Sequence, residues 1–366
     1  MSDDYQLSFP AIRGIQAGRE YYVAMCPVNV AVDIIKVSEE DVEMPDEMKA
    51  QRTLNKSRVP AIANYIVENP DSYAFSSLTV SIDSNVRFTA FGEDGMQRKL
   101  GILEVPYGVT YLINDGQHRR AALELALKEK PELKHETISL VLYVDQGLKR
   151  SQQLFADLNR YVVRPTPSIS ILFDHRDPMA RLMMDVVSKV EVFKDLTEKS
   201  KTTISNRSRK LFTLSVLYQS TCDLLKKKKG SNVTDENIEV AVKFWSEVCS
   251  NINDWQLAAR REVATSELRK DTIHAHGITL RALGRLGSSL LFHPEKEWKS
   301  KLKGLKKVDW SRFNSEIWTG RATTSTGRIS KTYSNIILTS NYLKGMIDIP
   351  LTPEEEEVES QFTARN

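Results

Sequence analysis

The feature that most constrains this chain is an extended run that turns through a glycine into a helix. Residues 109–113 are mostly apolar and favour a strand, Gly116 follows two polar residues later, and residues 121–127 are rich in Ala and Leu. The first N–H groups of such a helix have no partner within it, so the turn attracts anions. Arg119 and Arg120 fall in the first helical turn, where the helix dipole disfavours a cation unless an anion binds there. The junction therefore predicts an α/β domain with a candidate anion site.

This junction has two interpretations. In the first, Asp115 caps the helix, Gly116 serves the turn, and the arginines pair with surface glutamates. In the second, the turn binds a phosphate group, because Gly116 allows close approach and Arg119 can form a bidentate pair. The second interpretation predicts that Arg119→Lys weakens ligand binding and leaves the thermal midpoint nearly unchanged. The candidate phosphate or nucleotide site consists of Asp115, Gly116, Gln117, His118, Arg119 and Arg120.

His118 is the candidate catalytic residue, since an imidazole beside a phosphate site can act as a general acid or base. The alternative is that it only orients its neighbours by hydrogen bonding. The chain lacks GxxxxGK[ST], which excludes a P-loop enzyme. No metal site is predicted, because Cys26, Cys222 and Cys249 are far apart and form no ligand set with the six histidines.

The sequence around the junction resembles that of a known family. Residues 115–119 read DGQHR, and the chain resembles the DndB family of the DNA phosphorothioation (Dnd) systems. That family is distantly similar to the ParB/sulfiredoxin-like fold, whose Gly-x-x-Arg-Arg box matches residues 116–120. Further blocks of the resemblance lie at residues 51–65, 154–159 and 173–178. The resemblance implies that Arg52, Asn55 and Arg58 precede a helix near the turn and offer donors to the same anion.

The resemblance implies a DNA-binding protein of a phosphorothioation system, acting as a transcriptional regulator of the modification genes. Its partners would be double-stranded DNA of its own promoter region and other Dnd proteins. Two alternatives stay open: a nucleotide phosphohydrolase with DNA-binding or nicking activity, using ATP or another nucleotide with Mg²⁺, and a scaffold for the modification enzymes. Association into a homo-oligomer is also open.

The charge of the chain is unevenly distributed. Residues 1–150 carry 17 Lys and Arg against 22 Asp and Glu, whereas residues 151–349 carry 33 against 21. Neutralising phosphates is the commonest reason to concentrate cations in one part of a chain. The predicted DNA contacts are Lys226, Lys227, Lys228, Lys229, Arg207, Arg209, Lys210, Lys301, Lys303, Lys306, Lys307, Arg321 and Arg328. For the run of four lysines alone, a solvated loop is the alternative.

The remaining pattern predicts three parts. Residues 1–150 are expected to form an α/β or α+β ParB/sulfiredoxin-like domain with a mixed sheet, residues 151–350 a mainly helical basic domain, and residues 351–366 an acidic, disordered tail. No apolar run approaches the ~18 residues of a membrane span, and the N-terminus lacks the features of a signal peptide. The sequence therefore predicts a cytoplasmic protein without a membrane partner.

Local patterns give the expected elements. Besides the junction, strands are predicted at residues 21–25, 28–37, 78–82, 86–91 and 137–144, and a helix at residues 57–68. The strands at 78–82 and 86–91 are expected to form a hairpin around residues 83–85. Beyond residue 149, helical spacing of apolar residues occurs at 151–159, 179–190, 211–226, 235–251, 255–270 and 279–291.

Overall fold

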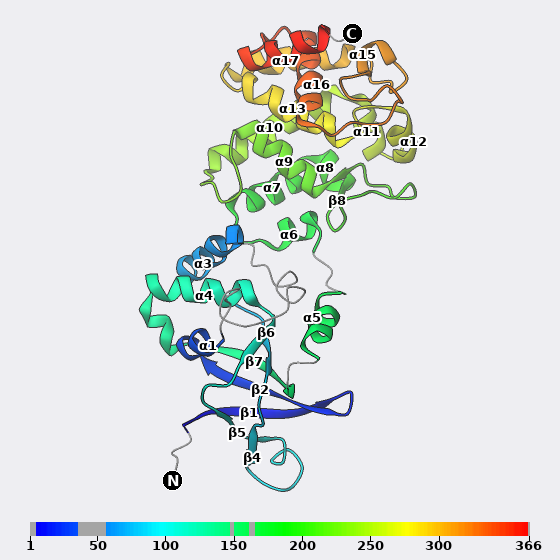
Figure 1. Cartoon of the computed structure of the whole chain (residues 1–366). Coiled ribbons are helices and arrows are strands. Elements are labelled where there is room, and N and C mark those ends of the chain that lie inside the picture. Colours follow the sequence, from blue (N-terminus) through cyan, green and yellow to red (C-terminus); the bar gives the residue numbers. More distant parts are fainter. Residues whose placement is uncertain (1–4, 36–55, 147–149, 161–164, 365–366) are drawn as a thin grey trace. The chain divides into compact units, whose positions relative to one another are not determined.

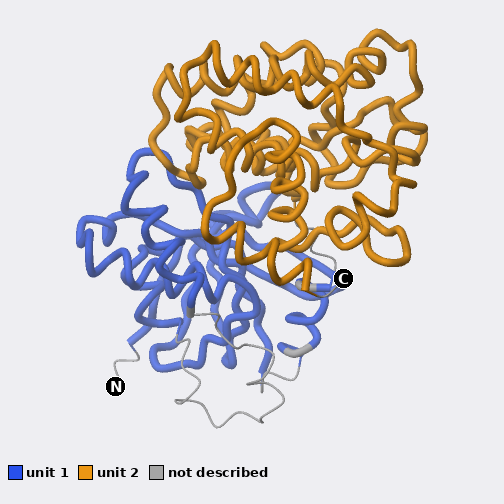
Figure 2. The backbone as a smooth tube through the Cα atoms, turned by 90° about the horizontal axis from the view of Figure 1, so that it is seen from above, with its two compact units in different colours: residues 1–163 blue, residues 164–366 orange. Residues whose placement is uncertain are grey.

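A computed structural model describes residues 5–35, 56–146, 150–160 and 165–364. The chain divides into two compact units, residues 1–163 (unit 1) and 164–366 (unit 2) (Figure 2). Each unit has its own buried apolar core. No helix in the described ranges is both long and apolar enough to cross a membrane.

Unit 1 contains a seven-stranded mixed sheet with the strand order β4-β5-β1-β2-β7-β3-β6. The strands are β1 (Gln6–Gln16), β2 (Arg19–Pro27), β3 (Leu78–Ile82), β4 (Arg87–Ala90), β5 (Leu100–Pro106), β6 (Tyr111–Asp115) and β7 (Thr137–Val144). Neighbouring strands are antiparallel, except for β3 and β7, which run parallel. Every residue of β3 is buried, so the sheet is covered on both faces at this strand.

Helices α1 (Val28–Ile34), α3 (Val59–Glu68) and α4 (Gln117–Glu129) lie together on one side of this sheet, and α5 (Ser151–Arg160) lies on the other (Figure 1). Two short 3₁₀ helices, η1 (Lys56–Arg58) and η2 (Pro131–His135), precede α3 and follow α4. Pro60 falls in the first turn of α3, where a missing N–H costs nothing. The sheet and its helices therefore place the β6–α4 junction beside α3.

Two strand predictions for unit 1 are wrong. Residues 28–34 form helix α1, whose buried Val28, Ala31 and Val32 follow a helical spacing that β-branched composition obscures. The expected hairpin is absent among the described strands, since β3 pairs with β6 and β7 while β4 pairs with β5. Strands β1 and β5 were not predicted, because Pro and Gly interrupt their apolar runs.

Unit 2 is mainly helical. Its elements are α6 (Pro167–Phe173), α7 (Pro178–Lys189), α8 (Glu191–Leu196), β8 (Thr197–Glu198), β9 (Phe212–Thr213), α9 (Leu214–Leu225), α10 (Asp235–Asn251), α11 (Asn253–Ala259), α12 (Thr265–Asp271), α13 (Gly277–Leu290), α14 (Glu295–Leu302), η4 (Lys303–Lys307), α15 (Ser315–Trp318), α16 (Tyr333–Met346) and α17 (Pro353–Thr363). All five tryptophans of the chain belong to this unit, and Trp245, Trp255 and Trp318 are fully buried in its core. The predicted helix at 255–270 is two helices, α11 and α12, because Arg261 adopts a left-handed backbone conformation between them.

The acidic segment at 353–363 is ordered, so the prediction of a disordered tail is wrong there. Thr352 and Glu355 form a capping box at the start of α17. The Glu355 carboxylate accepts a hydrogen bond of 2.7 Å from Lys344 of α16, and both side chains are buried. Arg285 and Arg321 pair with Glu354 and Glu359 of the same helix. Unit 2 thus supplies the cations that hold this acidic helix.

Candidate functional site

The glycine of the β6–α4 junction is required by its geometry. Gly116 is the N-cap residue of α4 with a φ of 102°, a conformation that L side chains rarely adopt. A Cβ atom at this position would lie 2.6 Å from Cδ2 of Leu78. The backbone of the junction is therefore packed closely against β3, and no side chain of a described residue caps α4.

Arg119 fastens this turn to the segment before β3. Its guanidinium donates hydrogen bonds to the carbonyl oxygens of Ser76 (2.6 Å) and Ser77 (2.8 Å) and to the Ser76 hydroxyl. It also pairs with Asp115 at 2.7 Å. The side chain is 18% exposed. Asp115 is therefore a partner of Arg119 and not the helix cap, and Arg119 would have to leave these groups to meet a phosphate.

Arg120 points to a different part of unit 1. Its guanidinium donates to the Glu124 carboxylate and to the backbone carbonyl of Val32, which ties α4 to α1. The residue is buried. Because this position is enclosed, Arg120 supports the packing of the junction, and the structure does not bring it to the same place as Arg119.

The charge of Arg58 acts on His118 beside the turn. His118 is half-buried in the first turn of α4, and its pKa is lowered by burial and by the charge of Arg58, while Asp115 opposes the shift. The imidazole is accordingly neutral near pH 7. Arg58 is the exposed N-cap residue of α3. Gln117 is half-buried at the first position of α4, and Arg52 and Asn55 lie outside the described residues.

Sequence reasoning missed the buried network beneath the turn. Asn114 is completely buried, donates 2.7 Å to the Ser81 hydroxyl and accepts 2.8 Å from the Ser151 hydroxyl. It thus joins β6 to β3 and to the start of α5. Since a buried amide without partners is costly, this network fixes the strand that carries the junction. The only sequence signal of this network was the polar residues that follow the apolar strand.

Several predicted DNA contacts in unit 2 are already engaged within the unit. Lys229 pairs with Asp174 at 2.7 Å, and Lys227, Lys210 and Lys301 donate to backbone carbonyl oxygens. The Lys226 ammonium lies 4.9 Å from the centre of the Phe292 ring. Arg321 pairs with Glu359 and lies over the Phe362 ring. Exposed pairs of this kind are weak and can exchange for a phosphate, but the half-buried Arg321 is held by α17.

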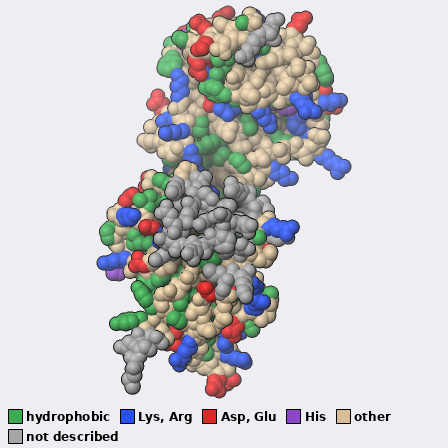
Figure 3. Space-filling view, viewed as in Figure 1, with side chains coloured by type: hydrophobic (Ala, Val, Ile, Leu, Met, Phe, Trp, Pro, Cys, Tyr) green, Lys and Arg blue, Asp and Glu red, His purple; other side chains and the backbone are tan. Residues whose placement is uncertain are grey.

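The other predicted contacts have head groups without a hydrogen-bond or ion-pair partner within the described ranges. They are Arg207, Arg209, Lys228, Lys303, Lys306, Lys307 and Arg328, and all are exposed. Figure 3 shows Lys and Arg side chains spread over the visible face of unit 2 and not gathered in one patch. The unpartnered head groups therefore come from the 202–211 segment, the loop after α9, η4 and the 319–332 segment.

Comparison with known proteins fixes the family. The sequence model of the family described as DndB, DNA-sulfur modification-associated, matches residues 9–350. The chain belongs to the DndB family. Membership of the DndB family implies involvement in a DNA sulfur modification system. No curated protein and no solved structure matches the chain. The resemblance identified from the DGQHR letters is thereby confirmed, whereas the likeness of unit 1 to the ParB/sulfiredoxin-like fold stays a prediction.

Proposed function

We propose that this DndB-family protein binds duplex DNA and regulates transcription of the modification genes from its own promoter region. The observation that carries the proposal is the set of seven exposed, unpartnered cationic head groups on unit 2, given above. Residues 151–349 carry a surplus of 12 positive charges, from 33 Lys and Arg against 21 Asp and Glu. A phosphate backbone is the polyanion that such a surface suits.

The proposed contact surface combines two parts of unit 2. Arg207 and Arg209 lie in the loop between β8 and β9, and Lys303, Lys306 and Lys307 lie on η4. Arginine can bind a phosphate with two parallel hydrogen bonds, and lysine adds a point charge. Contacts to phosphates position a protein on DNA without reading its sequence. Recognition of a promoter therefore needs further contacts to base edges.

The β6–α4 junction supports a second proposal, a phosphate or nucleotide site. The start of α4 offers backbone donors, Arg58 adds a nearby charge, and a neutral His118 can accept a proton. ATP or another nucleotide with Mg²⁺ is the ligand to test. In this proposal Arg58 replaces Arg119 as the cation, because Arg119 is occupied by Asp115, Ser76 and Ser77.

A gel-shift titration tests the DNA-binding proposal. The wild-type protein is titrated with the duplex upstream of its own gene and with a scrambled duplex of equal length. We expect tighter binding of the upstream duplex, and weaker binding of both by a variant with Gln at Arg207, Arg209, Lys303, Lys306 and Lys307. Lys194→Gln, at an exposed lysine of α8, is the matched control. Equal affinity for both duplexes would exclude a promoter-specific regulator.

A further inference from the structure

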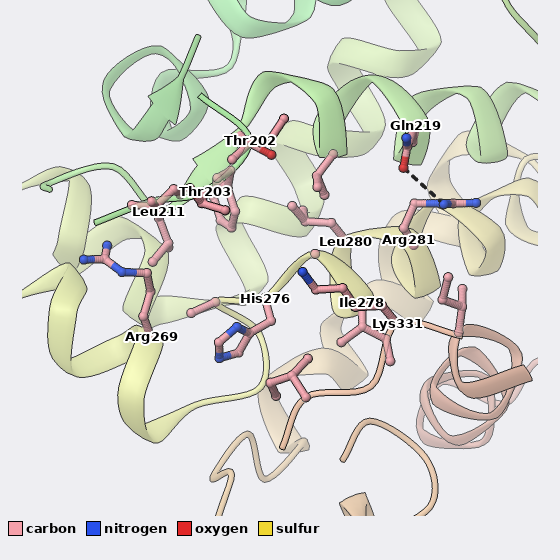
Figure 4. Close-up of a pocket in the computed structure, with 18 of the residues that line it drawn as sticks. Thr202, Thr203, Leu211, Gln219, Arg269, His276, Ile278, Leu280, Arg281 and Lys331 are labelled. Carbon is pink, nitrogen blue, oxygen red and sulfur yellow. Dashed lines mark hydrogen bonds between the residues drawn. The ribbon is translucent and has the colours of Figure 1, made fainter. Parts of the chain in front are cut away.

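A cavity of about 600 Å³ opens within unit 2. Its walls come from residues 202–213, α9, the last turn of α12, the start of α13 and residues 312–336, as Figure 4 shows for ten labelled side chains. Cavities of this volume are typical of small-molecule sites. Its lining comes from segments far apart in the sequence, so no motif revealed it.

Among the described residues, the cavity is lined by five cations and by no Asp or Glu. The cations are Arg269, Arg281, Arg312, Arg328 and Lys331. Arg281 is neutralised by Asp223 and also donates to Gln219 (Figure 4). None of the other four forms an ion pair with a carboxylate in the described part of the chain. Four uncompensated charges around one space produce a positive potential that favours an anion.

These four cations differ in how they are held. Arg269 donates to the backbone carbonyls of residues 205, 206, 208 and 210, and Arg312 donates to the carbonyl of Gly327 at 2.7 Å. Carbonyl oxygens orient a guanidinium but leave its net charge in place. Arg328 and Lys331 are exposed and make no side-chain hydrogen bond to any described residue. Two fixed charges and two adaptable ones therefore surround the cavity.

The rest of the lining combines polar side chains, among them Thr202, Thr203 and Gln219, with an apolar part. Leu211, Val216, Ile278 and Leu280 line the cavity, and Figure 4 shows Leu211 near Arg269 and Leu280 near Arg281. An inorganic anion alone would leave this apolar surface in contact with water. A ligand that also carries an apolar or aromatic group would cover it.

His276 contributes a buried, unpaired ring nitrogen to the wall of this site. Burial, the charge of Arg312 and, more weakly, that of Lys331 lower the pKa of His276 to about 4, although a hydrogen bond to the Arg269 backbone opposes the shift. The ring is therefore neutral near pH 7. Its buried Nε2 has no hydrogen-bond partner in the structure as described. An unpaired buried nitrogen is costly, and a polar group of a ligand would remove that cost.

We propose that this cavity binds a small phosphorylated molecule that also carries an apolar or aromatic group. The phosphate lies among Arg312, Arg328 and Lys331, and the apolar group lies against Val216, Ile278 and Leu280. His276 hydrogen-bonds to the ligand through Nε2. The residues of this site all belong to unit 2, none of them belongs to the β6–α4 junction, and the proposed ligand is distinct from duplex DNA.

Titration calorimetry in EDTA tests this proposal with AMP, ATP, inorganic phosphate and adenosine. We expect AMP or ATP to bind, and adenosine and phosphate each to bind at least about tenfold more weakly, because each lacks one half of the ligand. Lys331→Gln and Arg328→Gln should each weaken nucleotide binding by about tenfold. Lys194→Gln, which removes an equal charge from outside the cavity, should have no effect. Tryptophan fluorescence confirms that each variant keeps the fold of unit 2.

Three results would overturn the proposal: no binding of AMP or ATP to the wild-type protein, nucleotide binding that neither variant weakens, or loss of duplex affinity in both variants without nucleotide binding. The third result would assign the cavity to the DNA surface. Failure of the DNA-binding proposal looks different, because it would appear as unchanged duplex affinity in the variant at Arg207, Arg209, Lys303, Lys306 and Lys307. Arg328 belongs to both sets of cations, but that variant leaves it unchanged, so the two proposals can fail independently.

Discussion

At the scale of single residues, Gly116 gives the sharpest prediction. Gly116→Ala should lower the free energy of unfolding of unit 1 by about 3 kcal/mol, from about 1 for the left-handed backbone and about 2 for overpacking against Leu78. Gly108→Ala is the matched control, since Gly108 also has a positive φ but nothing lies within 4 Å of an added Cβ. Hydrogen exchange of peptides from β6 and α4 measures both. Equal costs for the two variants would show that contact with Leu78 does not matter.

Arg119→Lys should destabilise unit 1 by about 1–2 kcal/mol, because one ammonium cannot replace the bonds to Asp115, Ser76 and Ser77. The sequence alone suggests the opposite, a nearly unchanged thermal midpoint. The same exchange at Arg87, whose side chain is 76% exposed, should change stability by less than about 0.5 kcal/mol. Thermal unfolding followed by circular dichroism compares the two. An unshifted midpoint for Arg119→Lys would restore its assignment as a free phosphate ligand.

The sequence predicted where the junction lies and that its arginines could pair with glutamates, as Arg120 does with Glu124, but it did not predict their partners on other elements. The DGQHR stretch located a strand, a glycine turn and a helix correctly. The serine partners of Arg119 lie more than 40 positions earlier in the sequence, and the partner of Arg120 on α1 lies still further away. Contacts over such separations are set by the sheet order, which local spacing does not encode.

At the scale of elements, α17 is held by a buried charge pair. Glu355→Gln should lower the free energy of unfolding of unit 2 by about 3–5 kcal/mol, because the buried Lys344 ammonium loses its counter-ion. Urea unfolding followed by tryptophan fluorescence reports this unit, which contains every tryptophan of the chain. Glu356→Gln, at an exposed position of the same helix, should have little effect. A double variant with Lys344→Met and Glu355→Leu should recover most of the loss, and a single variant as stable as the wild type would contradict the pairing.

The same pair predicts an acid dependence. Burial alone would raise the pKa of Glu355, but hydrogen bonds from Lys344 and the Thr352 N–H, with the charges of Lys344 and Arg285, lower it overall. A lowered carboxyl pKa adds stability above the ordinary glutamate value of about 4.3, and this stability is lost as the pH falls through the folded-state pKa. As the pH falls, the free energy of unfolding of unit 2 should therefore decrease more in the wild-type protein than in Glu355→Gln. Parallel pH profiles for the two proteins would rule out this contribution.

Elements with a clear period were predictable, and elements stabilised by distant partners were not. Helices α7, α9, α10 and α13 follow the apolar spacing of their own sequences. Helix α17 reads as a solvated acidic run, because its stabilising cations Arg285, Arg321 and Lys344 belong to other segments. The sequence of helix α1 predicts a strand, because Val and Ile favour strands. The sheet against which this helix packs is formed by other segments, so the local sequence does not reveal it.

At the scale of the whole molecule, the charge surplus of residues 151–349 predicts strong salt dependence. Binding of duplex DNA should weaken with salt with a log–log slope near −0.9 for each neutralised phosphate. The variant with Gln at Arg207, Arg209, Lys303, Lys306 and Lys307 should make the slope shallower by up to about 4.5, if each residue contacts one phosphate. Filter binding between 50 and 200 mM salt, a range in which such slopes are large, measures both proteins. An unchanged slope would place the DNA contacts elsewhere.

The spacing of apolar residues and the charge count predicted that the second part of the chain is helical and basic, and the resemblance carried by DGQHR predicted the modification system. Neither located the cavity lined by Arg269, His276 and Lys331. These residues are separated by helices and loops, and each is unremarkable in its own stretch of sequence. Only the packing of α9, α12 and α13 places them around one space.

The pairing of Lys344 with Glu355 also sets an order of events during protein synthesis. Lys344 leaves the ribosome before residues 353–363, and until they follow, burying its ammonium costs several kcal/mol. Domains usually fold as units while the chain is still being made. Helix α16 therefore cannot pack favourably into unit 2 until α17 has been synthesised. Unit 2 completes its folding late, even if its other helices have already formed.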